Sequence, residues 1–160
     1  MSISIGSEAP DVVLFEKTAE GVRKFSLSDY RGKQNVVLLF FPAVFTNVCT
    51  TEMCTIRDTM SDYDALDAKV IGISADLPYS QQIWKDQLHL NMTLASDHNR
   101  YGMKSYGVEY NSFGGGLEGV SKRASFVIDR EGILRYSEIL DNANELPSFD
   151  GIKGALGMLK

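Results

Sequence analysis

A short apolar run that ends at a proline constrains this sequence more than any other feature. Residues 36–41 read Val-Val-Leu-Leu-Phe-Phe and contain no polar side chain. A run of this length without alternation is typical of a strand that is buried on both faces of a sheet. Pro42 follows at once, and because proline lacks the N–H that a ladder needs, the strand must end there.

An amphipathic pattern begins a few residues after this strand. Five apolar side chains recur at spacings of four, three, four and three residues, which places them on one face of a helix. They are Cys49, Met53, Ile56, Met60 and Tyr63. The helix starts near Thr46, so Cys49 lies in its first turn, where unpaired N–H groups and the helix dipole favour a thiolate. The position indicates a reactive cysteine, although a lone cysteine at a helix start is more often a small buried hydrophobe.

The composition narrows the class of protein. The 160 residues carry a net charge of −5 without a basic cluster, which argues against nucleic acid as the main partner. No apolar run approaches the length of a membrane span, and no signal-like segment opens the chain, so we expect no membrane association. We expect a single domain over residues 1–160, located in the cytoplasm.

The two cysteines, Cys49 and Cys54, are too few and too close together for a disulfide scaffold. In a reducing compartment such a pair is more often catalytic, redox-sensing or metal-binding. Zinc needs about four ligands, and the only histidines, His89 and His98, have no ligand-type spacing to the cysteines. We therefore expect no metal, and nothing else in the sequence implies another cofactor.

The rest of the chain alternates strands and helices. The predicted strands cover residues 11–15, 22–27, 36–41, 69–74, 92–95, 124–128 and 133–137. Helical patterns follow the third, fourth, fifth and seventh of them, the last three over residues 79–90, 100–106 and 149–159. This order predicts an α/β protein with a central mixed β-sheet flanked by helices. It resembles a thioredoxin-like fold with an added N-terminal β-hairpin.

Three residues with a characteristic spacing make the resemblance to one protein family specific. Pro42, Thr46 and Cys49 stand as P-x-x-x-T-x-x-C, which resembles the active-site pattern of the peroxiredoxins, thiol peroxidases on a thioredoxin fold. The similarity covers nearly the whole chain, including the strand after Arg123. The longer motif F-P-x-x-F-T-x-x-C resembles that of the alkyl hydroperoxide reductase E-type branch of this family. A second cysteine five residues later instead resembles the bacterioferritin-comigratory, or Q-type, branch.

The resemblance implies a thiol-dependent peroxidase that reduces hydrogen peroxide and alkyl hydroperoxides. In that reaction a thiolate attacks one oxygen of the O–O bond and becomes a sulfenic acid. Cys49 matches the nucleophile, Thr46 the hydroxyl beside the sulfur, and Pro42 the residue that shields the sulfur from water. Arg123 matches the arginine that brings a permanent cation to the thiolate and the peroxide.

Some of these residues have a simpler interpretation as well. Thr46 also fits an ordinary N-cap, and Arg123 alone would be an ordinary surface arginine. Glu52 is favourable in the first turn of a helix through the dipole alone. In the resembling family a glutamate here often orients the arginine, so Glu52 is a candidate supporting residue.

Cys54 decides the catalytic cycle. On an ideal helix it lies about 7.5 Å along the axis from Cys49 and about 140° around it. A disulfide usually needs Cα atoms within about 7 Å, so an intact helix forbids the bond. Either Cys54 is a packing residue and an outside thiol resolves the sulfenic acid, or the first turns unwind. The five-residue spacing resembles that of Q-type resolving cysteines and favours the second alternative.

The resemblance also implies a substrate, a reductant and an assembly, and two alternative functions remain open. A peroxide is the expected substrate, thioredoxin or a similar dithiol the reductant, and a homodimer a common assembly. One rival is a thiol–disulfide oxidoreductase of the same fold, which typically carries C-x-x-C rather than the C-x-x-x-x-C found here. The other is a non-enzymatic redox sensor or holdase.

Overall fold

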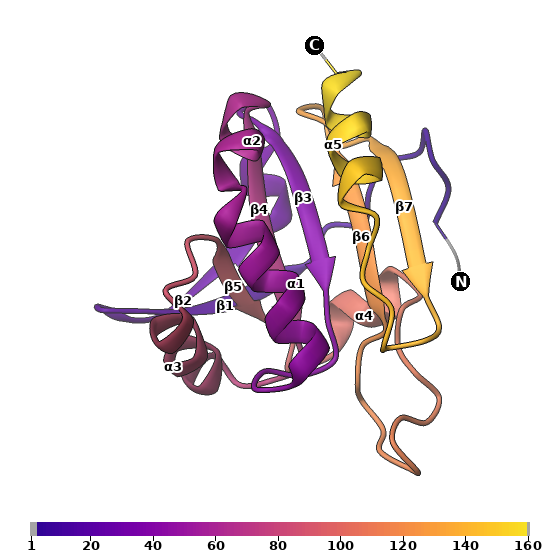
Figure 1. The fold of residues 1–160 in the computed structure, drawn as a ribbon. Coiled ribbons are helices and arrows are strands. Elements are labelled where there is room, and N and C mark those ends of the chain that lie inside the picture. The colour runs from indigo at the N-terminus through magenta and orange to yellow at the C-terminus, as the bar shows by residue number, and fades with distance from the viewer. Residues whose placement is uncertain (1–2, 160) are drawn as a thin grey trace.

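The computed structural model describes residues 3–159, which form a seven-stranded mixed sheet with helices on both faces (Figure 1). The strands are β1 (Val13–Thr18), β2 (Gly21–Ser26), β3 (Asn35–Phe40), β4 (Ala68–Ser74), β5 (Thr93–Ser96), β6 (Arg123–Ile128) and β7 (Leu134–Leu140). The helices are the 3-10 turn η1 (Leu27–Tyr30), α1 (Asn47–Asp58), α2 (Met60–Ala65), α3 (Pro78–Leu88), α4 (Tyr101–Ser105) and α5 (Phe149–Gly157). The predicted fold class is confirmed, including the added N-terminal hairpin β1–β2.

The apolar run forms the centre of the sheet. The strand order is β2-β1-β5-β4-β3-β6-β7, and β3 pairs parallel with β4 and antiparallel with β6. All six residues of β3 are buried. The strand ends one residue earlier than predicted, although the Phe41 N–H still donates to the carbonyl of Ile73 at 2.9 Å before Pro42 interrupts the ladder.

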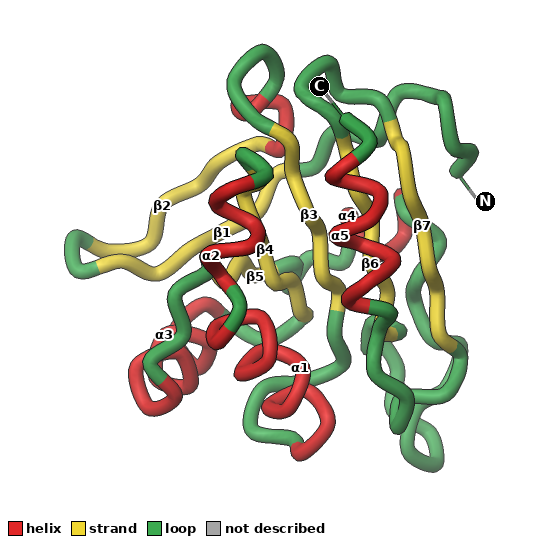
Figure 2. The backbone as a smooth tube through the Cα atoms, turned by 45° about the horizontal axis from the view of Figure 1, so that its top comes forward, coloured by secondary structure: helices red, strands yellow, loops and turns green. Residues whose placement is uncertain are grey.

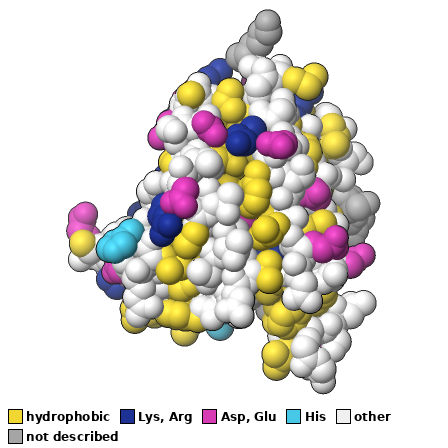
Figure 3. All heavy atoms as spheres, in the orientation of Figure 1, with side chains coloured by type: hydrophobic (Ala, Val, Ile, Leu, Met, Phe, Trp, Pro, Cys, Tyr) yellow, Lys and Arg dark blue, Asp and Glu magenta, His cyan; other side chains and the backbone are white. Residues whose placement is uncertain are grey.

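Side chains that alternate along β3 build two separate cores. Val37 and Leu39 belong to the core beneath α1, α2, α3 and α5, while Leu38 and Phe40 belong to the core that includes Met103 of α4. Figure 2 shows α1, α2, α3 and α5 on one face of the sheet. Seen from that side, a band of apolar side chains lies between charged groups in Figure 3. The burial of β3 on both faces therefore follows from helices on both sides.

One predicted helix is divided in two. The apolar stripe from Cys49 to Tyr63 predicts a continuous helix, but α1 ends at Asp58 and α2 begins at Met60. Thr59 between them has φ −119° and ψ 20°, and its hydroxyl donates to the carbonyl of Thr55 at 2.8 Å. Tyr63 is still fully buried, so a local break leaves the direction of the apolar face unchanged.

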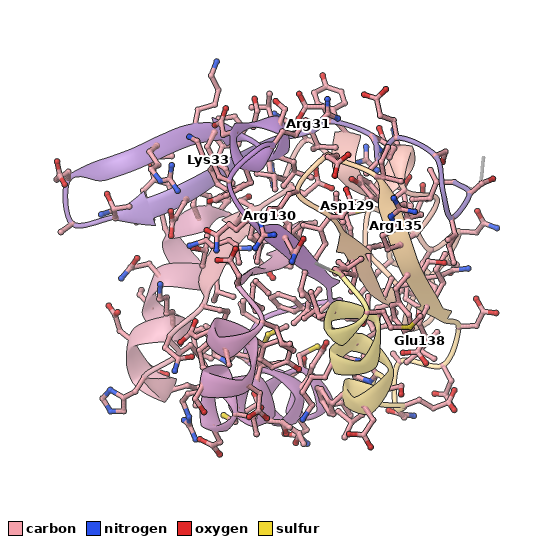
Figure 4. The ribbon with its side chains drawn as sticks, turned by 90° about the horizontal axis from the view of Figure 1, so that it is seen from above. Arg31, Lys33, Asp129, Arg130, Arg135 and Glu138 are labelled. Carbon is pink, nitrogen blue, oxygen red and sulfur yellow. The ribbon has the colours of Figure 1, made fainter. Side chains whose placement is uncertain are left out.

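The turn between β6 and β7 lies at the end of the sheet opposite the start of α1. Asp129 accepts hydrogen bonds from the N–H groups of Glu131 and Ile133 and from Arg135 Nε at 2.7 Å. Figure 4 shows Asp129 and Arg135 close together at this turn. One carboxylate therefore holds the turn across residues 129–132.

Among residues 3–159, no helix is both long and apolar enough to cross a membrane.

Candidate active site

The loop between β3 and α1 has an unusual backbone. Pro42 is buried, and Phe45 adopts a left-handed conformation with φ 64°, which is uncommon for any residue other than glycine. Thr46 then occupies the N-cap position of α1 in an extended conformation. Its hydroxyl does not cap the helix but donates to the carbonyl of Ala43 at 2.7 Å. Because that donation uses the hydroxyl proton, the Thr46 oxygen is left as an acceptor.

Cys49 lies in the first turn of α1, as the sequence predicts. Its side chain is only 1% exposed and joins the core that contains Phe41 and Met53. The helix begins two residues earlier, at Asn47, so the thiol sits at the positive end of the α1 dipole. Arg123 Nη1 donates to the Cys49 sulfur at 3.4 Å. The sulfur is therefore shielded from bulk water and faces a permanent cation.

Sheet pairing brings Arg123 to this cysteine. Arg123 is the first residue of β6, rather than the residue before it as predicted, and Ala124 pairs with Phe40 at the end of β3. The arginine is 1% exposed. Its Nη1 also donates to Glu52 Oε1 at 2.7 Å, and its Nη2 donates to the carbonyl of Ala143 at 2.8 Å. The interpretation of Arg123 as a surface residue is therefore wrong.

Glu52 is a buried partner of this arginine. Its side chain is fully buried, one carboxylate oxygen bonds Arg123, and the other has no hydrogen-bond partner among the described residues. Burial raises the pKa of Glu52 to about 7, and the attraction of Arg123 offsets only part of that effect. Burial alone would lower the pKa of Arg123, but the charges of Glu52 and Cys49 raise it. One cation thus serves two groups that can each be anionic.

A pocket opens over these groups. Four of the predicted catalytic residues line it, together with five further residues. The predicted four are Pro42, Thr46, Cys49 and Arg123, and the other five are Asn47, Val48, Phe113, Ala143 and Asn144. Phe113 comes from the glycine-rich loop before β6, and Ala143 and Asn144 come from the connection between β7 and α5. No motif marks these loop positions, because only tertiary structure brings them to the pocket.

Cys54 lies outside this pocket. It is half-buried on α1, where it packs against the same core as Cys49, and both cysteines are free thiols. The helix is continuous from Asn47 to Asp58, which includes both cysteines, as the sequence predicts for the reduced protein. Resolution by Cys54 therefore requires a change in α1.

The pocket combines a shielded sulfur with a fixed positive charge. A buried sulfur faces a guanidinium, which is charged at all relevant pH values and has several N–H donors. The Thr46 oxygen, an acceptor, lines the same pocket. A thioredoxin-like sheet that carries such a site is typical of the thiol peroxidases.

Comparison with known proteins agrees with this class, and the chain belongs to the AhpC/TSA family, whose model matches residues 5–137. Alkyl hydroperoxide reductase E of Mycobacterium tuberculosis is 34% identical over 139 residues, which cover 86% of each chain. Peroxiredoxin-2 of Mus musculus is 32% identical over 163 residues, covering 98% of this chain and 77% of the relative.

Solved structures give the same family. The reduced 2-Cys peroxiredoxin of Plasmodium vivax superposes with a TM-score of 0.85 at 25% identity, covering 96% of this chain and 80% of that one. Peroxidoxin BcpB of Mycobacterium tuberculosis gives a TM-score of 0.79 at 25% identity, covering 96% and 94%. The protein is therefore a peroxiredoxin and a thiol-dependent peroxidase.

Proposed function

We propose that Cys49 is the nucleophile that reduces hydrogen peroxide and alkyl hydroperoxides. Its thiolate attacks one peroxide oxygen, the O–O bond breaks, and the sulfur is oxidised to sulfenic acid. The other oxygen leaves with the electron pair as hydroxide or alkoxide and takes up a proton. The observation that carries this proposal is the 3.4 Å contact between Arg123 Nη1 and the buried Cys49 sulfur.

The neighbouring residues have distinct roles in this proposal. Arg123 holds the thiolate and stabilises the charge that develops on the peroxide oxygens. Thr46 accepts a hydrogen bond from the peroxide O–H, since its own proton is donated to Ala43. Pro42 covers the pocket and limits water. Glu52 supports the site by accepting a hydrogen bond from Arg123 Nη1 at its Oε1, at 2.7 Å, which holds the guanidinium in place.

Cys54 is the proposed resolving residue. Its thiol attacks the sulfenic sulfur of Cys49, forming an intramolecular disulfide and releasing water. This step requires the first turns of α1 to open, because both cysteines lie on one continuous helix. The alternative is that Cys54 only packs against the core and that an external thiol resolves Cys49.

The last step of the catalytic cycle is the reduction of this disulfide by an external dithiol. We propose that thioredoxin or a similar dithiol reduces the 49–54 disulfide. Two free cysteines suit a reducing compartment, which supports a cytoplasmic location. A homodimer is the assembly that membership of the family suggests.

Steady-state turnover with thioredoxin and its reductase tests the role of Cys54. Cys54→Ser should undergo one rapid oxidation by peroxide but lose thioredoxin-linked turnover, because no second thiol completes the cycle. Thr55→Ser, a neighbouring change of similar size on the same helix, is the matched control and should turn over normally. Full turnover by Cys54→Ser, or oxidised wild type without a 49–54 link in peptide mapping, would show that Cys54 is a packing residue.

A further inference from the structure

The loop that carries Pro42 and Thr46 is tied to a neighbouring connection by one carboxylate. The N–H of Val44, in the middle of this loop, donates to Asp76 Oδ2 at 3.0 Å. Asp76 follows β4 and lies in the connection to α3, far from the loop in sequence. The same carboxylate oxygen accepts a hydrogen bond from the Ser74 hydroxyl at 2.7 Å.

Buried polar side chains fix this carboxylate in place. Gln81 Nε2 donates to the Ser74 hydroxyl oxygen and to the carbonyl of Ala95, both at 2.9 Å. The Ser96 hydroxyl donates to the Asp76 carbonyl at 2.6 Å. Ser74, Gln81 and Ser96 are each at most 1% exposed. The anchor therefore belongs to a frame made by β4, β5 and α3, whereas the loop it holds belongs to the candidate active site.

We propose that Asp76 is a positioning residue that holds this loop in the conformation that reacts with peroxide. This inference rests on the proposed role of Cys49 and, for the effect on disulfide formation, on that of Cys54. Val44 lies one residue before Phe45, whose left-handed backbone is unfavourable on its own and needs support from outside the loop. Two residues further on, Thr46 bonds back to Ala43 and begins α1. Fixing Val44 thus fixes where the Thr46 oxygen points.

The same bond opposes resolution. If the first turns of α1 open so that Cys54 can reach Cys49, the loop that precedes the helix must move, and the Val44–Asp76 hydrogen bond breaks. Loss of Asp76 therefore slows the attack on peroxide and speeds disulfide formation. A variant that weakened the whole fold would also speed amide exchange far from the loop, whereas loss of Asp76 should act on the loop itself.

Asp76→Ala removes the acceptor, and Asp76→Asn keeps an oxygen that can accept from both Val44 and Ser74. Asp129→Ala is the matched control, because it removes a carboxylate that holds two backbone N–H groups at the opposite end of the sheet.

The single tryptophan, Trp84, provides a fluorescent probe of the loop. Its ring centroid lies 5.5 Å from that of Phe41 and 6.5 Å from that of Phe45, so its fluorescence reports on the loop.

Two measurements on the full chain decide the matter. Amide exchange of reduced protein should be about tenfold faster at Val44 in Asp76→Ala, and close to wild type in Asp76→Asn and Asp129→Ala. Stopped-flow Trp84 fluorescence with hydrogen peroxide should show an oxidation phase about tenfold slower in Asp76→Ala, with a faster disulfide phase.

Unchanged exchange at Val44 in Asp76→Ala, or equally fast exchange there in Asp129→Ala, would overturn the proposal. So would a normal oxidation rate, or oxidation and disulfide phases that slow together. If wild type failed to react with peroxide, the proposed function would fail, while the exchange measurement would still decide whether Asp76 holds the loop.

Discussion

Arg123 concentrates the electrostatics of the site in one side chain. Its guanidinium bonds the Cys49 sulfur, the Glu52 carboxylate and the Ala143 carbonyl, and it is almost completely buried. A planar fork can direct several donors at once, whereas an ammonium group is a compact point charge on a flexible stem. The shape of the arginine, and not only its charge, is therefore used here.

Arg123→Lys should be a poor peroxidase despite keeping the positive charge. We expect Cys49 oxidation to slow by at least about tenfold, because lysine cannot keep the contacts with the sulfur and the carboxylate in the same geometry. Stopped-flow oxidation by hydrogen peroxide measures this rate. Arg135→Lys, at the far turn, is the control and should react normally. A normal rate for Arg123→Lys would remove this residue from the site.

Glu52 should make stability depend on pH. Its pKa rises from 4.5 to about 7 on folding, chiefly through burial, so the folded state holds the proton more tightly than the unfolded state. The free energy of unfolding contributed by Glu52 must then fall as pH rises from about 4.5 through about 7, by roughly 3 kcal/mol at most.

Comparison with Glu52→Gln isolates this effect, because glutamine does not titrate. Urea unfolding of both proteins between about pH 5 and about pH 8 should show wild type losing stability relative to the variant as pH rises. A stability difference that is constant over this range, or that grows in favour of wild type, would contradict the buried carboxyl having a raised pKa.

The sequence predicted the residues of the site better than their surroundings. Pro42, Thr46 and Cys49 are close in sequence, so a local pattern marks them, and family resemblance added Arg123. Thr46 was predicted as a possible cap, but its hydroxyl turns back to Ala43. That outcome depends on the left-handed backbone at the preceding residue, which no propensity indicates.

At the scale of elements, α1 combines a fixed position with weak intrinsic helicity. Four threonines in or at the end of the helix donate their hydroxyls to carbonyls four residues earlier, and these are Thr50, Thr51, Thr55 and Thr59. β-Branched residues have modest helix propensity, and such back-bonding slightly destabilises a helix and bends it. Most of the stability of α1 must then come from its buried face. This is consistent with a helix whose first turns can open.

Oxidation should therefore loosen α1 locally. Once the proposed 49–54 disulfide has formed, amide exchange should be faster over residues 46–55 than in reduced protein, while β3 and β6 stay protected. Hydrogen-exchange mass spectrometry of both states measures this, with Cys54→Ser treated with peroxide as the control that cannot form the bond. Equal exchange over residues 46–55 in the two states of wild type would contradict opening of the helix.

The break between α1 and α2 shows where periodicity reaches its limit. The apolar stripe predicts the buried face correctly through Tyr63, yet the helix is interrupted at Thr59. Spacing reports which side chains face the core, and a single non-helical residue leaves that order intact. Helix boundaries elsewhere moved by one or two residues for the same reason.

At the scale of the whole molecule, the sheet order assembles the site. β3 ends where β6 begins, because the two strands are antiparallel neighbours, and this places the start of α1 beside Arg123. The alternation of strands and helices predicted the fold class. Beyond pairing within hairpins, it did not predict which strands pair, nor that Phe113, Ala143 and Asn144 reach the pocket from two loops. Those features depend on contacts between distant segments.

In the proposed reaction, the Cys49 sulfur itself takes an oxygen atom from the peroxide. A single-turnover experiment tests it most directly: Cys54→Ser protein is mixed with one equivalent of hydrogen peroxide, and peptide mass spectrometry locates the added oxygen. We expect one peroxide to be consumed per chain, with the oxygen on Cys49. The double variant that carries both Cys49→Ser and Cys54→Ser should show no comparable reaction. Rapid peroxide consumption without Cys49, or an oxygen found on another residue, would contradict this account of the site.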